Sequence, residues 1–179
     1  RAPCWNEGTH RMTIWDYIVW ALTCVFGGIF PARTALYFLA PAKGRVRWIV
    51  PYLVIGAALG MPTWAGDGNP LYYFPFLIAA FLVGYGGRPA ARLVVGMIFF
   101  EWIIAWSMIV DTRAVLPGSA GYWGAMAWKL AMWAAVWLLM RRVFRDGKQV
   151  ALSGRLWALL GLLALSPLLS ELAFSMWDI

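Results

Sequence analysis

Residues 93–110 read LVVGMIFFEWIIAWSMIV, an apolar run that a single charge, Glu101, interrupts. At a rise of about 1.5 Å per residue, a helix over this run nearly crosses the roughly 30 Å hydrocarbon core of a bilayer. Lipid offers the backbone no hydrogen-bond partners, so a helix that bonds within itself is the default for such a run. The stretch therefore predicts a membrane-spanning helix.

Further apolar runs lie on both sides of this one and complete the expected fold. Strands of a membrane barrel would alternate polar and apolar residues over about ten positions, and these runs do not. We expect an all-α fold, a polytopic membrane helix bundle of about six transmembrane helices, in which an extracytoplasmic tail at 1–12 precedes a transmembrane domain at 13–179. The expected spans are 13–39 with a bend near Pro31, 48–64, 71–87, 93–110, 123–140 and 156–177.

The composition agrees with burial in lipid. The 179 residues are 63% hydrophobic and 13% charged, whereas a soluble domain has about 45–50% apolar and about 25% charged residues. One soluble core of this length could not enclose so much apolar surface. The chain has 2 Cys and 1 His, too few for a disulfide framework, a metal site or His-based catalysis, so no cofactor and no metal is expected.

The net charge of +7 is concentrated in alternate connectors between the apolar runs. That distribution indicates cytoplasmic loops rather than a nucleic-acid surface. It predicts a multi-pass protein of the cell membrane with an extracytoplasmic N-terminus, whose partner is the lipid bilayer and not nucleic acid. The cations on the expected cytoplasmic side are Lys43, Arg45 and Arg47, then Arg88 and Arg92, and finally Arg141, Arg142, Arg145, Lys148 and Arg155.

Charged residues within the expected spans are the candidates for function, because a charge at mid-helix costs roughly 2.5–3.5 kcal/mol on the insertion scale. Lys129 and Glu171 each lie about 9 Å below the expected outer boundary and could pair. One interpretation is an outward-opening polar cavity that receives a ligand, and the other is an internal ion pair that fixes helix packing. The candidate ligand-binding residues are Glu101, Lys129, Glu171, Asp111, Asp67 and Tyr73, and no catalytic residue is expected.

Structural roles compete with ligand binding at several positions. Glu101 could be protonated or hydrogen-bonded within the bundle, and Tyr73 could belong to an aromatic belt at the membrane surface. Two pairs of small residues, Gly56-x-x-x-Gly60 and Ala131-x-x-x-Ala135, allow helix backbones to approach closely. We expect both pairs to pack within the bundle rather than to form a dimer face.

A family resemblance is carried by GDGNPLYYFPF at 66–76, by the helix from Arg92 through Phe99 and Phe100 to Asp111, and by SGRLW at 153–157 with Pro167. Over residues 47–167 the chain resembles the membrane regions of Gram-positive sensor histidine kinases with a GHKL-type ATPase domain, akin to peptide-pheromone receptors. The resemblance implies a sensor region that forms a homodimer and signals to a cytoplasmic kinase module. A seventh span is then expected beyond Ile179, in a longer protein.

The favoured function is a membrane sensor of an extracytoplasmic ligand, a peptide or a small molecule, bound near the outer ends of the third to sixth spans. The alternative is the substrate-binding membrane component of a vitamin-type uptake transporter, to which the chain is similar in size and helix number. Such components show an Ala-x-x-x-Ala docking motif in the first helix, whereas here the pair lies in the fifth span. An intramembrane enzyme that uses Glu101 or Asp111 as an acid or base ranks last, because no paired catalytic group is visible.

Overall fold

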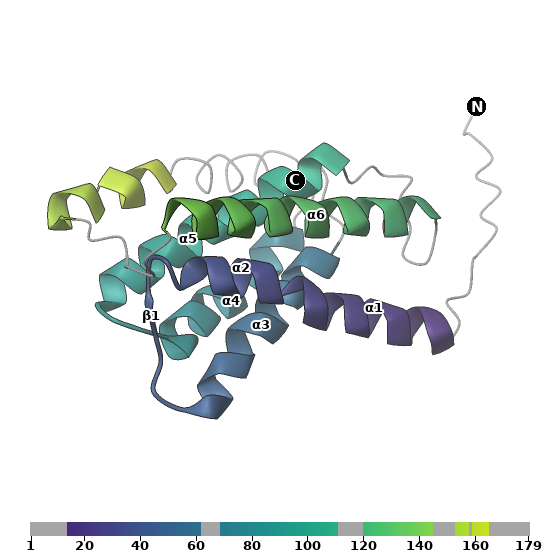
Figure 1. Ribbon diagram of the computed structural model, residues 1–179, viewed down its shortest axis with the longest axis horizontal. Helices are drawn as coiled ribbons and strands as arrows, with labels where there is room; N and C mark the ends of the chain where they lie inside the picture. The colour runs from purple at the N-terminus through teal and green to yellow at the C-terminus, as the bar shows by residue number, and fades with distance from the viewer. Residues whose placement is uncertain (1–13, 62–68, 111–119, 145–152, 158, 165–179) are drawn as a thin grey trace.

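The computed structural model describes residues 14–61, 69–110, 120–144, 153–157 and 159–164 (Figure 1). These residues are mostly helical, which confirms the all-α prediction. The elements in chain order are α1 (Ile14–Gly27), α2 (Ile29–Ala35), β1 (Ala40–Pro41), α3 (Arg45–Gly60), α4 (Asn69–Gly84), β2 (Tyr85–Gly86), α5 (Pro89–Val110) and α6 (Ala120–Val143). Residues 154–157 and 159–164 are helical as well.

Two of the described helices are long and apolar enough to cross a membrane. They are Pro89–Ile109, with a mean hydropathy of 1.7, and Tyr122–Val143, with a mean hydropathy of 1.2. These segments belong to α5 and α6. The other apolar helices among the described residues are shorter, and two of them end at Gly60 and Gly84.

The first apolar run forms two helices in place of the single bent helix expected over 13–39. The interruption lies at Gly28, between α1 and α2. Pro31 is buried in α2 and has no N–H to donate to the carbonyl oxygen of Gly27, four residues earlier, so the helical hydrogen bonding is interrupted there. The interruption thus lies within one turn of Pro31, near where the bend was expected.

Glycines allow α1 and α3 to cross at close range. A Cβ atom on Gly28 would overlap the carbonyl group of Tyr52, and one on Gly56 would overlap the carbonyl group of Cys24. A Cβ on Gly60 would meet the Cys24 sulfur. The expectation that the Gly56–Gly60 pair packs within the bundle is confirmed, since only glycine lets the two backbones approach this closely.

The second small-residue pair differs, because Ala131 and Ala135 are both exposed on α6. Within the described part of the chain, the expectation that this pair packs inside the bundle is wrong. The face of α6 that packs inward carries Trp133 instead, which is fully buried.

Aromatic side chains fill the core between the helices. α1 packs on α3, α3 on α4, α4 on α5, and α2 on α6, and Figure 1 shows α6 running alongside α2. The ring of Trp133 stacks on that of Phe99, with 5.3 Å between centroids and 23° between planes. Phe100 meets Phe74 edge-on at 4.7 Å. These contacts join α4, α5 and α6 through interlocked rings, which associate in such tilted or offset geometries.

A short antiparallel ladder closes one end of the molecule. Ala40 of β1 pairs with Gly86 of β2, and Pro41 pairs with Tyr85. The Tyr85 hydroxyl donates a 2.8 Å hydrogen bond to the carbonyl oxygen of Ala32 in α2. The connector that precedes α3 and the connector that follows α4 therefore lie side by side.

Candidate functional site

Lys129 of α6 is one of the candidate ligand-binding residues predicted from the sequence. Its side chain is buried, at only 2% exposure. Its Nζ donates a 3.3 Å hydrogen bond to the carbonyl oxygen of Leu59. Tyr122, about two turns earlier on the same helix, donates a 2.8 Å hydrogen bond to the carbonyl oxygen of Gly60. Both acceptors belong to the last turn of α3, which ends at Gly60.

Carbonyl groups in the last turn of a helix have no partner within that helix, and the negative end of the helix dipole favours a cation. Lys129 and Tyr122 therefore act together as a cap on α3, supplied by α6. We call these two hydrogen bonds the α3–α6 link. Its geometry explains how an ammonium group is accommodated among apolar helices.

Three of the sequence-predicted site residues lie outside the described residues. They are Asp67, Asp111 and Glu171. The proposed ion pair between Lys129 and Glu171 therefore stays a prediction. The described residues show a backbone acceptor for Lys129, the carbonyl oxygen of Leu59. The sequence did not predict this contact, because the end of α3 is distant from Lys129 along the chain.

Tyr73 and Glu101 lie on neighbouring helices, α4 and α5. Tyr73 is 8% exposed, and its ring meets the ring of Phe100, the residue before Glu101, edge-on at 5.8 Å. Two other aromatic residues of the same stretch behave differently, since Tyr72 and Phe76 are exposed. An outward-facing aromatic belt therefore fits Tyr72 and Phe76, whereas Tyr73 points into the bundle beside the segment that carries Glu101.

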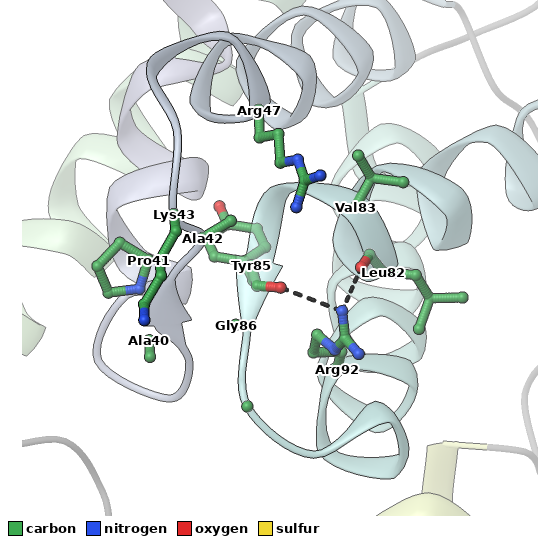
Figure 2. A pocket seen from close by; sticks show the side chains of 11 residues that line it. Ala40, Pro41, Ala42, Lys43, Arg47, Leu82, Val83, Tyr85, Gly86 and Arg92 are labelled. Atoms are coloured by element: carbon green, nitrogen blue, oxygen red, sulfur yellow. Dashed lines mark hydrogen bonds between the residues drawn. The ribbon is translucent and has the colours of Figure 1, made fainter.

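A second polar feature, which the sequence did not single out, lies at the β1–β2 end. It is a pocket of about 670 Å³, shown in Figure 2, between the two connectors and the end of α4. We call it the basic pocket. Its lining residues are Ala40, Pro41, Ala42, Lys43, Arg47, Leu82, Val83, Tyr85, Gly86, Gly87 and Arg92.

Arg92 is the best-positioned cation of the basic pocket. One of its terminal nitrogens, Nη1, donates to the carbonyl oxygens of Leu82 and of Tyr85, the latter at 3.2 Å (Figure 2). Its Nε is buried and has no hydrogen-bond partner among the described residues. Two carbonyl oxygens at the end of α4 thus fix Nη1 of the guanidinium, whereas Nε makes no hydrogen bond within the described residues.

Lys43 and Arg47 complete the cationic lining from the other connector. Both side chains are exposed, and Figure 2 shows the Arg47 guanidinium on the pocket side of α3. None of the residues that line the pocket is acidic. The connectors at 40–47 and 85–92 contain five cations and no carboxylate, which is the signal in the sequence that could have pointed to this pocket.

Metal binding has no candidate in the described part of the chain, where no three His, Cys, Asp or Glu residues cluster. No protein-family model, no curated protein and no solved structure matches this chain. The resemblance to sensor kinases stays an expectation from the sequence, and function has to be inferred from the residues and their geometry.

Proposed function

We propose that this chain is the membrane-embedded sensor region of a signalling protein, with several spans and an extracytoplasmic N-terminus. It detects an extracytoplasmic ligand, a peptide or a small molecule, and signals to a cytoplasmic histidine kinase module. The observation that carries the proposal is the α3–α6 link, in which a buried cation on one helix holds the end of another.

Insertion in a membrane is supported by the exposure of α6. Only 22% of its apolar segment Tyr122–Val143 is buried inside the structure, whereas the core helix of a soluble protein is mostly buried. Large apolar side chains such as Leu138 and Leu139 face outward at 54% and 60% exposure. Lipid accepts such a face without the cost that water would impose.

The expected orientation is supported by the β1–β2 pair. The connectors that carry Lys43 and Arg88 were both expected in the cytoplasm, and the ladder holds them at one end of the molecule. The α3–α6 link lies at the far end of α3, which begins beside that ladder and ends at Gly60. Under the positive-inside rule, the link then lies toward the extracytoplasmic side.

The link gives a ligand a way to act on helix positions. A ligand carboxylate near Lys129 would compete with the Leu59 carbonyl for the ammonium group, because a charge-assisted hydrogen bond is the stronger one. Release of the Leu59 carbonyl would free the end of α3 from α6. The ligand can shift this equilibrium only by as much as it prefers the released arrangement.

A chimera tests the sensor proposal. The chain is fused to the catalytic module of a histidine kinase in membrane vesicles, and autophosphorylation is measured for the parent chain and for Lys129→Met. If the link sets the signalling state, Lys129→Met changes the kinase activity several-fold, whereas Arg142→Gln, an exposed change on the same helix, leaves it unaltered. Equal activity of all three proteins, at equal expression and insertion, would refute the proposal.

The transporter alternative is favoured by one observation, the exposure of Ala131 and Ala135 on α6. An exposed pair of small residues at this spacing allows close approach of a partner helix, as an energising partner would require. Vitamin uptake that depends on the chain and is lost in Ala131→Leu/Ala135→Leu would favour this function over sensing. Retained uptake, or no uptake by the parent chain, removes it.

A further inference from the structure

We propose that the basic pocket binds a phosphate-bearing anion, and that its source is the headgroup of an anionic lipid. The pocket gathers Lys43, from the connector before α3, Arg47, from the start of α3, and Arg92, from the start of α5. No role in sensing at the opposite end of α3 requires this arrangement.

The first step is the geometry around Arg92. Its hydrogen bonds to the Leu82 and Tyr85 carbonyl oxygens orient the guanidinium plane (Figure 2). The Arg92 side chain lines the pocket beside Lys43 and Arg47, so its guanidinium places a fixed positive charge where a phosphate would bind. A pre-oriented guanidinium loses little freedom when it binds an oxyanion, because its planar fork matches phosphate geometry.

The second step is the electrostatics of the helix ends. Arg47 is the third residue of α3 and Arg92 the fourth of α5, and neither helix has an acidic residue in its first turn. The positive end of a helix dipole disfavours cations and favours anions. Cations at these positions, with no carboxylate in the lining, are stabilised when an anion occupies the pocket between them.

The third step selects lipid over a free anion. The pocket wall includes Leu82 and Val83, and Val83 is 50% exposed. An apolar wall beside a cationic rim suits a headgroup whose acyl chains continue along α4. Basic pockets between membrane helices on the cytoplasmic side bind anionic headgroups in this way. The lipid source rests on the proposed membrane insertion, whereas the anion site itself does not.

The test measures retained lipid. The full chain, purified in neutral detergent at high ionic strength, is titrated with phosphatidic acid or phosphatidylcholine, and bound lipid is counted by native mass spectrometry. We expect the parent chain to retain phosphatidic acid preferentially and Lys43→Gln/Arg47→Gln to lose about tenfold or more of that affinity. Arg88→Gln/Arg142→Gln removes the same charge from positions that do not line the pocket and should change the affinity by less than about twofold, since neither side chain contacts the bound anion.

Arg92→Lys keeps the charge but loses the planar guanidinium that two carbonyl oxygens hold, and it should weaken phosphatidic acid retention several-fold.

A competition experiment with inorganic pyrophosphate distinguishes a lipid headgroup from a soluble anion. Displacement of lipid by pyrophosphate supports the anion site with a soluble source, and failure to displace supports the lipid headgroup. Equal losses in the two double variants, or equal retention of phosphatidylcholine, would overturn the proposal. Co-flotation of the parent chain with neutral phosphatidylcholine vesicles tests membrane insertion separately.

Discussion

At the scale of single residues, two free energies oppose each other at Lys129, the hydrogen bond to the Leu59 carbonyl and the burial of its charge. A hydrogen bond to a charged group contributes about 1.5–3 kcal/mol, and placing a charge at membrane depth costs roughly 2.5–3.5 kcal/mol. Methionine fills a similar volume without the charge.

We therefore predict that Lys129→Met changes the free energy of unfolding by less than about 1 kcal/mol, because the lost hydrogen bond and the relieved burial of charge offset each other.

Tyr122→Phe removes a neutral hydrogen bond to Gly60 and should cost about 0.5–1.5 kcal/mol. Reversible denaturation in detergent micelles measures both. A loss above about 3 kcal/mol for Lys129→Met would mean that the ammonium group mainly holds the fold together.

At the scale of helices, the crossing of α1 and α3 depends on the absence of side chains. Tertiary contacts between helices in lipid rely on close packing, because lipid tails are as apolar as the side chains they replace. The contact of Gly56 with the Cys24 carbonyl group therefore has a larger share in stability than a contact of the same area would have in a soluble protein.

Gly56→Ala should destabilise the protein by about 1–3 kcal/mol or more, because the new methyl group overlaps backbone that cannot move aside without separating α1 from α3. Gly124 in α6 is a matched control, since nothing lies within 4 Å of a Cβ built there. Gly124→Ala should stabilise by about 0.5–1 kcal/mol through helix propensity alone. Thermal unfolding of the two variants in the same detergent compares them, and equal melting temperatures would contradict the crossing.

The same crossing illustrates what the sequence could and could not predict about the elements. Apolar runs and turn residues were enough to predict helices. The four-residue spacing of small residues predicted internal packing correctly for Gly56 and Gly60 but not for Ala131 and Ala135. The close approach of Gly28 to the Tyr52 carbonyl was not predicted, nor was the pairing of Ala40 with Gly86 beside the basic pocket. Such contacts join distant residues, and no local pattern encodes them.

At the scale of the whole molecule, the β1–β2 pair makes a prediction about topology. In a background in which Cys4 and Cys24 are replaced by Ala, single cysteines at Lys43 and at Arg88 should both resist a membrane-impermeant thiol reagent added outside the cell. A cysteine at Asp67, in the connector between α3 and α4, should react. The reagent applied to inverted vesicles reverses the pattern. Opposite accessibility of positions 43 and 88 cannot be reconciled with the observed ladder.

The β1–β2 pair also has a consequence for the order in which the chain folds. Two backbone positions provide little free energy, whereas closing a loop from Ala40 to Gly86 carries a sizeable entropy cost. The ladder can therefore form only after α3 and α4 have packed on each other and brought its strands together. During synthesis, the α3–α4 hairpin therefore assembles first, and Gly86 must leave the ribosome before β2 can pair with β1.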